Sequence, residues 1–254
     1  MAALLTGGCL LGPCLPAFAR AQQSHPFSIS VEPSYFGGTF ATAHTIRVYE
    51  LPLSLEYHGA RLRTRLEIPY IALQGAGLLN GGSVIQTSGH PVWRTGLGDI
   101  WAAASYRVLD TSGLSPSIRP YVKIKIPTAS RSSGLGTGQP DVEFGSHFEW
   151  NISGRLLPYA RAGYRIAGRA RGLKLRNTLT FEAGASLVVP YHGYVTALFL
   201  DNGTPQRGVG PFEQLIAAYT VRISPTLDFQ TYLTRGLTPN SPKFGAGMGF
   251  TEKF

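Results

Sequence analysis

Charged side chains recur at every second position in several short apolar segments of this chain. Residues two positions apart lie on one face of a β-strand, so each segment would gather its charges on one face. Neighbouring strands lie about 4.8 Å apart, close enough for cross-strand ion pairs. The same charges could instead ring an aqueous path and select solutes, and the sequence leaves both interpretations open. The residues concerned are Glu50, Glu56, Arg61, Arg63, Arg65, Lys123, Lys125, Glu143, His147, Glu149, Arg161, Arg165 and Glu182.

Four side chains of one segment could also hold a metal ion. Asp141, Glu143, His147 and Glu149 lie at even spacing, which suits a hard divalent cation. A single histidine among acids is more often ion-paired, so we predict no metal site and no cofactor.

Hydrolysis is the other chemistry that these residue types allow. It needs a serine, a histidine and an acid within mutual reach. Ser146 beside His147 is the nearest candidate, but adjacent residues on a strand point to opposite faces. The glycines of residues 134–138 lack the Lys-Ser/Thr that follows a phosphate-binding loop. The remaining histidines have no evident serine partner: His25, His44, His58, His90 and His192. We therefore predict that the protein is not an enzyme, with a barrel-wall esterase or phospholipase as the alternative.

The elements that must position these side chains are β-strands. The 254 residues are 43% apolar and include 31 Gly and 18 Pro, and the mean hydropathy is +0.02. After the N-terminus no run reaches the ~18 apolar residues of a transmembrane helix. In the clearest segment, residues 47–58, leucines and tyrosines alternate with Glu50, Ser54 and Glu56. Such alternation is typical of transmembrane barrels, in which the apolar face meets lipid.

Twelve such segments follow one another without a linker or a break in composition. On the third segment, three arginines on one face would each cost about 2–4 kcal/mol in lipid, so that face points inward. Links after odd-numbered strands are mostly long and the others mostly short, as expected when both termini are periplasmic. We predict one all-β domain, residues 22–254, forming an antiparallel up-and-down transmembrane β-barrel of about twelve strands. The strands span about residues 27–36, 47–58, 61–73, 97–108, 118–128, 141–150, 159–166, 179–189, 194–201, 213–224, 226–235 and 243–254.

The last segment alternates aromatic residues with glycines and ends in an aromatic residue. Phe250 and Phe254 fit the assembly signal of bacterial outer-membrane barrels, while Glu252 takes an outward position that we place at the interface below the apolar band. We predict that small inward residues leave an off-centre water path where the first and last strands meet. These residues are Gly245, Gly247, Gly249, Ser28, Ser30 and Ser34.

Residues 1–21 predict a cleaved signal peptide, because they are small and apolar and end in Ala19-Arg20-Ala21. Cys9 and Cys14 lie inside it, so the exported chain would have no cysteine. The positive charge expected at its start is missing, which suggests that Met1 lies within a longer signal. The net charge is +9, but the basic residues alternate within apolar strands, so we predict no nucleic-acid partner.

Three segments in order resemble a known family. They are Gly96-Leu97-Gly98-Asp99-Ile100 with Tyr106-Arg107, then Ile126-Pro127-Thr128, then residues 134–138 with Asp141. They are similar to the meta-pathway of phenol degradation family of outer-membrane proteins, and the likeness runs from about Gly96 to the C-terminus. The resemblance implies a barrel often described as a transporter of hydrophobic or aromatic compounds. It identifies no catalytic group.

We therefore predict a monomeric channel or uptake protein in the outer membrane of a Gram-negative bacterium. Small solutes, among them aromatic or hydrophobic compounds, would diffuse through it passively. The expected partners are outer-membrane lipids, the barrel-assembly machinery and the solute. The alternative is a structural or adhesive barrel with a closed, salt-bridged lumen, which would pass almost no current until Arg61, Arg63 and Arg65 are neutralised.

Overall fold

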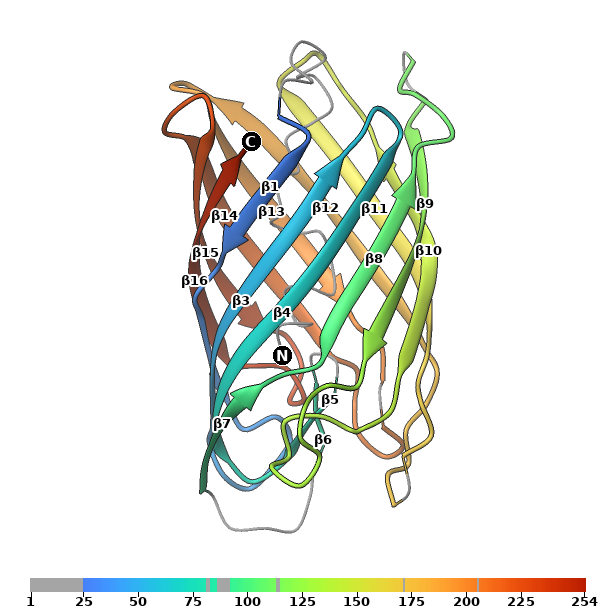
Figure 1. The fold of residues 1–254 in the computed structure, drawn as a ribbon, viewed down its shortest axis with the longest axis vertical. Helices are drawn as coiled ribbons and strands as arrows, with labels where there is room; N and C mark the ends of the chain where they lie inside the picture. The colour runs from blue at the N-terminus through green and yellow to red at the C-terminus, as the bar shows by residue number, and fades with distance from the viewer. Residues whose placement is uncertain (1–24, 81–82, 86–91, 113–114, 171, 205) are drawn as a thin grey trace.

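The computed structural model describes residues 25–80, 83–85, 92–112, 115–170, 172–204 and 206–254, and the predicted signal peptide lies outside them. The chain forms a closed antiparallel barrel with steeply inclined strands (Figure 1). The strands are β1 (Phe27–Val31), β2 (Ser34–Gly38), β3 (Ile46–His58), β4 (Leu62–Gly75), β5 (Leu78–Asn80), β6 (Ser83–Ile85), β7 (Val92–Leu97), β8 (Ile100–Tyr106), β9 (Ser117–Ile126), β10 (Asp141–Glu149), β11 (Leu156–Ile166), β12 (Thr178–Val189), β13 (Gly193–Asp201), β14 (Glu213–Arg222), β15 (Leu227–Gly236) and β16 (Phe244–Lys253). No helix long and apolar enough to cross a membrane occurs among these residues.

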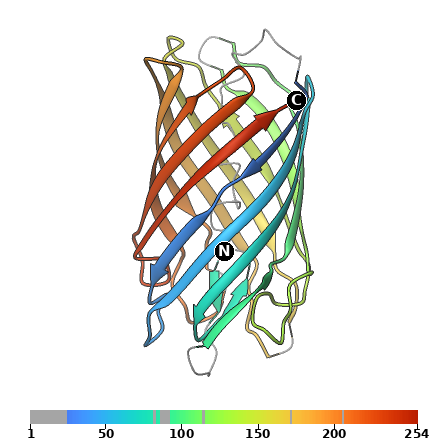
Figure 2. The ribbon, with the colours of Figure 1, turned by 60° about the vertical axis from the view of Figure 1, so that its left-hand side comes forward.

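The barrel wall has twelve staves, as predicted, and two of them are interrupted. β1 and β2 make the first stave, which breaks at Glu32 and Pro33, and β7 and β8 make the fourth, which breaks at Gly98 and Asp99. The first break keeps its contacts, because Met248 N–H donates to Pro33 O at 3.1 Å. β16 pairs with both β1 and β2 and so closes the ring (Figure 2).

The outer face is apolar, as the alternation predicts. On β3, Leu51, Leu53 and Leu55 are exposed, while Glu50 and Ser54 on the opposite face are buried. A continuous apolar surface of this kind is costly in water and suits lipid.

The two ends of the barrel differ in the length of their connections. Phe27 and Phe254 lie together at one end, where Phe27 N–H donates to Phe254 O at 3.1 Å and their rings stack. We call this the short-turn end, because its connections are mostly tight (Figure 1). At the other, long-loop end the connections include residues 127–140, 167–177 and 202–212. The alternation of long and short connections along the chain matches the predicted one.

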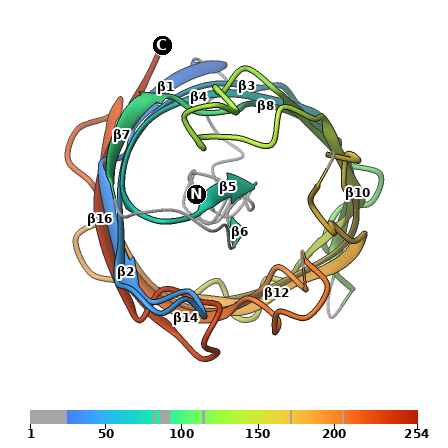
Figure 3. The same cartoon turned by 90° about the horizontal axis from the view of Figure 1, so that it is seen from below.

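The stretch left between the third and fourth predicted strands, residues 74–96, is partly strand, so the predicted boundaries were wrong there. β4 continues to Gly75 and β7 begins at Val92, which completes the fourth stave. Between them β5 and β6 pair as a hairpin inside the ring of staves (Figure 3). The apolar residues Leu79 and Val84 are buried there, so their hydrophobicity serves the lumen and not the lipid face. Strands of three residues are too short to show a periodicity in sequence.

Candidate functional site: the lumen

The inner face of the barrel has two chemically different walls. We call the inward side of β9 to β12 the charged wall, because it carries most of the buried charged side chains. The opposite inner surface, from β2 to β4 and β13 to β15, is apolar toward the long-loop end, and we call it the apolar wall. The hydrophobic side chains buried on it are Phe36, Ile46, Val48, Ile71, Leu73, Leu198, Leu200, Ile216, Ala218 and Tyr232.

Glu143 is the hub of the charged wall. Its register places it opposite Lys123 of β9 and Arg165 of β11. Arg165 Nε donates to Glu143 Oε2 at 2.8 Å, and Arg161 Nη1 donates to Oε1 at 3.0 Å. Tyr121 also donates its hydroxyl to Oε1 at 2.8 Å, and Arg161 continues the network to Glu182. All these side chains are buried, so their charges are compensated within the wall.

Lys125 links the charged wall to a loop at the long-loop end. Its fully buried Nζ lies 2.9 Å from Asp141 Oδ2 and 3.7 Å from Asp99 Oδ2. It also donates to Thr137 Oγ1 at 3.1 Å, and Thr137 belongs to the link between β9 and β10. Lys123 instead lies over the Trp101 ring, with Nζ 4.3 Å from its centroid. Both predicted inward lysines therefore face the lumen.

The predicted arginine face on β4 is only partly inside the lumen. Arg65 Nη1 donates to Glu56 Oε1 at 2.6 Å, and Arg65 Nη2 donates to Glu67 Oε2 at 3.2 Å. Arg63 is half-buried opposite His58, but Arg61 lies in the turn before β4 and is exposed. The parity is right, but the strand begins one residue after Arg61, so this arginine lies at the short-turn end and not in the packed interior.

The acids proposed above as metal ligands are engaged separately. Asp141 pairs with Lys125, Glu143 with Arg161 and Arg165, and Ser117 Oγ donates to Glu149 Oε2 at 3.4 Å. The His147 ring packs against the Tyr121 ring at 4.8 Å. Within the described residues, no group of three or more His, Cys, Asp or Glu side chains is suited to hold a metal.

The space predicted above the seam glycines is occupied by side chains. A methyl group at Gly247 would lie 2.4 Å from the Tyr232 ring, and one at Gly245 would lie 2.4 Å from the Phe36 ring. At Gly249 it would meet Glu32 Cγ at 2.8 Å. These glycines face inward, as do the buried Ser28, Ser30 and Ser34, but they make room for large neighbours and not for water. The empty space from which a seam path was inferred is therefore filled.

One histidine has a serine neighbour that the sequence did not reveal. Ser28 Oγ lies 3.2 Å from His58 Nε2, so the expectation that His58 lacks a serine partner was wrong. Glu56 Oε2 contacts the same nitrogen at 3.2 Å. A triad needs the acid on one ring nitrogen and the serine on the other, so this geometry does not form one. The pairing depends on the register of β1 with β3, which alternation alone does not give.

The β5–β6 hairpin narrows the lumen beside the apolar wall (Figure 3). Leu79 and Val84 join the apolar cluster, together with Leu135 from the link between β9 and β10. Leu79 N–H donates to Gly134 O at 3.0 Å. Arg94 of β7 clamps the base of the hairpin, donating to Gly75 O at 2.7 Å and Ser133 O at 3.2 Å. Sequence reasoning missed Arg94, although a lone arginine among aromatic and glycine residues was a signal.

No family model matches the sequence, and no curated protein matches it either. Among solved structures, the chain is similar to the COG4313 outer membrane channel from Pseudomonas putida F1, with 12% identity, a TM-score of 0.70, and coverage of 92% of this chain and 97% of that one. It is similar to the translocator domain of the autotransporter NalP from Neisseria meningitidis, with 12% identity, a TM-score of 0.57, and coverage of 100% and 97%. For outer membrane phospholipase A from Escherichia coli the values are 9%, 0.51, 95% and 97%. At these identities the likeness shows a common fold, that of Gram-negative outer-membrane barrels.

Proposed function

We propose that this protein is an outer-membrane channel or uptake protein through which small aromatic or hydrophobic solutes diffuse passively. The observation that carries the proposal is the lumen with one apolar and one charged wall. An apolar ring gains about 25 cal/mol for each Å² that it removes from water, which favours the apolar wall. A polar or acidic substituent on the ring could face the arginines and lysines opposite. An aromatic carboxylate combines both properties.

Two further lines support this proposal. The Pseudomonas putida structure is by its title an outer membrane channel, and its fold covers nearly this whole chain. The segments from Gly96 to Asp141 resemble the phenol-degradation family, which is often described as transporting aromatic compounds. The proposal includes export by residues 1–21, assembly through Phe250 and Phe254, and a monomer in the outer membrane.

A second function, a structural barrel with a closed lumen, is favoured by a specific observation. Lys125, Glu143 and Arg161 are almost completely buried inside the barrel, and their charges are paired. The β5–β6 hairpin fills more of the same interior. Such a barrel would carry no solute.

Flux through liposomes containing the full chain separates the two functions. The solutes are benzoate, phenol and benzylamine, which share an aromatic ring and differ in charge, with glucose as a hydrophilic control. A channel of the proposed kind passes benzoate and phenol faster than benzylamine and glucose. Equal rates for the three aromatic solutes would reject the preference for aromatic acids, and rates equal to those of empty liposomes would support the closed barrel.

A matched pair of variants tests the role of the apolar wall. Ile216 of β14 points into the lumen and is buried, while its neighbour Leu215 points outward and is exposed. We expect Ile216→Thr to lower phenol flux and Leu215→Thr to leave it unchanged. Equal flux in both variants would show that solutes do not contact this wall.

A further inference from the structure

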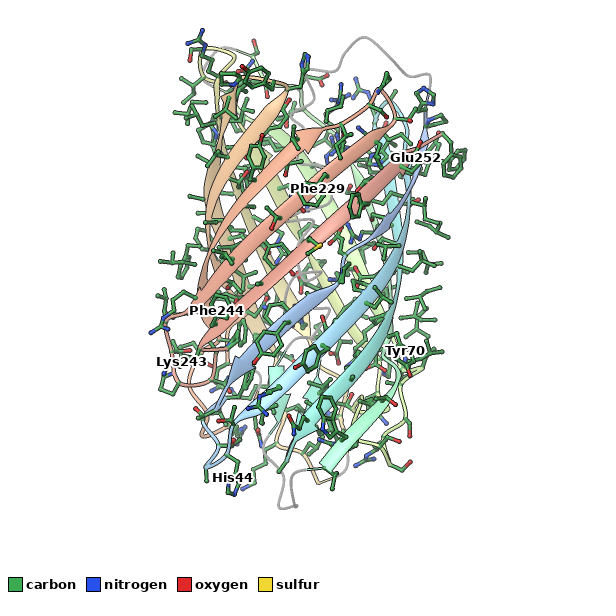
Figure 4. The ribbon with its side chains drawn as sticks, turned by 90° about the vertical axis from the view of Figure 1, so that its left-hand side faces the viewer. His44, Tyr70, Phe229, Lys243, Phe244 and Glu252 are labelled. Carbon is green, nitrogen blue, oxygen red and sulfur yellow. The ribbon has the colours of Figure 1, made fainter. Side chains whose placement is uncertain are left out.

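The long-loop end of the barrel exposes charges of one sign. Asp110 and Glu252 are the exposed acidic side chains of the described residues, and both lie at the short-turn end. The exposed charged side chains described at the long-loop end are basic. They include Arg169, Lys174 and Arg207 in the loops. Three others, which we call the wall cations, are Arg47 in β3, Arg235 in β15 and Lys243 directly before β16. Figure 4 shows Lys243 and Glu252 at opposite ends of the same outer face.

The three wall cations form a row across four neighbouring staves. Phe244 of β16 is paired with Gly37 of β2, and Gly37 is paired with Arg47 of β3. On the other side, the register of β15 with β16 ends at Thr234 and Gly245, which places Arg235 beside Phe244. Arg235 Nη1 donates to the backbone O of Lys243 at 3.2 Å, so the Arg235 guanidinium lies beside the Lys243 backbone. Three strand spacings, about 14 Å, separate Arg235 from Arg47.

The middle of the row carries the hydroxyl group of Tyr35. Gly37 has no side chain, and Tyr35 folds over it, because a methyl group at Gly37 would lie 2.5 Å from Tyr35 Oη. The Tyr35 hydroxyl can therefore donate a hydrogen bond between the two groups of cations. Phosphate oxygens accept such bonds from arginine, lysine and tyrosine together.

Aromatic rings mark the height of this row on the barrel. Tyr35 packs on Tyr49 at 5.1 Å between ring centroids, and Tyr49 stacks on Trp93 at 5.9 Å. Phe244 is exposed next to Lys243, as Figure 4 shows. Outer-membrane barrels place aromatic girdles at the membrane interface. The cations just beyond these rings therefore lie at the level of lipid headgroups.

We propose that Arg235, Lys243, Arg47 and the Tyr35 hydroxyl bind the phosphate groups of an anionic glycolipid in the outer leaflet. Arg235 and Lys243 face one phosphate and Arg47 faces a second, about 14 Å along the row. The exposed leucines below the row, such as Leu51 and Leu233, contact the acyl chains. The proposal rests on the proposed outer-membrane location and is independent of solute transport.

Native mass spectrometry of the detergent-solubilised full chain tests this site. The protein is titrated with diphosphorylated lipid A, with its dephosphorylated form and with inorganic phosphate. The test variant carries Arg47→Gln, Arg235→Gln and Lys243→Gln. The control variant removes the same number of charges from the loops. It carries Arg169→Gln, Lys174→Gln and Arg207→Gln. A third variant, Arg47→Lys with Arg235→Lys, keeps the charge.

We expect the wall variant to bind diphosphorylated lipid A on the order of 100-fold more weakly, because each cation near an anionic surface contributes about fivefold. The loop variant should stay within about threefold of the original chain, and the lysine variant should retain most of the affinity. Equal loss in the wall and loop variants would overturn the site in favour of diffuse attraction. Undiminished binding of the dephosphorylated lipid, or displacement of lipid A by millimolar phosphate, would also overturn it. Flux of phenol measured on the same variants keeps this outcome separate from the transport proposal.

Discussion

Glu143→Gln is the most direct test of whether water is excluded from the ion pairs of the charged wall. The substitution keeps the shape of the side chain and one carbonyl oxygen, but it removes the negative charge that Arg161 and Arg165 share. Glu143 has no measurable exposure, and both arginines are nearly fully buried. Two buried guanidinium groups would therefore face a neutral amide.

The expected loss in the free energy of unfolding follows from the geometry of the network. Removing one partner of a buried ion pair costs about 3–5 kcal/mol. Glutamine still accepts a hydrogen bond from Tyr121 or Arg161, and Glu182 still pairs with Arg161, so we expect a loss near the lower bound, about 3 kcal/mol. For a urea dependence of about 3 kcal/mol per molar, the unfolding midpoint would fall by about 1 M.

Urea unfolding of the refolded barrel in phospholipid vesicles measures this loss, with tryptophan fluorescence as the signal. Trp101 is a suitable reporter, because the Arg165 guanidinium lies 5.9 Å from its ring centroid. Glu252→Gln is the control, since Glu252 is exposed at the short-turn end and should change stability by less than about 0.5 kcal/mol. If Glu143→Gln lowers the free energy of unfolding by less than about 1 kcal/mol, water screens these charges and the reasoning is refuted.

Three other substitutions test the barrel wall and the lumen. Gly145→Ala should strongly reduce the folded fraction, because its methyl group would lie 2.1 Å from the Ala162 carbonyl oxygen. The heat-dependent shift in gel mobility measures this fraction. Gly210→Ala is the control and should leave the folded fraction unchanged, since its methyl group would have no atom within 4 Å. Gly247→Ala should lower the free energy of unfolding in urea by about 1–3 kcal/mol, because its methyl group displaces a tyrosine ring. Its single-channel conductance should be unchanged. A fall in conductance would support the water path at the seam. Arg94→Ala should raise conductance by releasing the β5–β6 hairpin, and a current equal to the original would show that the hairpin does not limit passage.

The outer face of the barrel could be predicted from the sequence almost residue by residue. Lipid imposes one requirement on every outward position, so the parity of Leu51 or Phe250 follows from alternation alone. Most strand boundaries followed as well, because glycine and proline mark the turns, but those of β4 and β7 did not. Glu252 is exposed, in agreement with its predicted outward position.

The sequence predicted which residues point into the lumen, but it did not predict which side chains fill the space beside them. Gly247 points inward as expected, yet Tyr232 from the neighbouring stave covers it. Ser28 meets His58 only because β1 pairs with β3 in one particular register. Contacts of this kind depend on cross-strand register, and a shift by one residue would turn every side chain to the other face. The inward course of β5 and β6 was missed for a different reason, because the apolar residues there do not alternate.

The division of the lumen into two walls follows from the way charges must be compensated. A buried charge needs a partner within a few ångströms, and in an antiparallel barrel the nearest side chains on the same face belong to the adjacent strands. Lys123, Glu143 and Arg165 therefore come from three consecutive strands, each opposite the next. Consecutive strands that share their charges gather them on one side of the barrel. β3 and β4 keep a smaller network, in which Arg65 pairs with Glu56 and Glu67. Toward the long-loop end, these strands and β13 to β15 line the lumen with apolar residues, which face the charged wall.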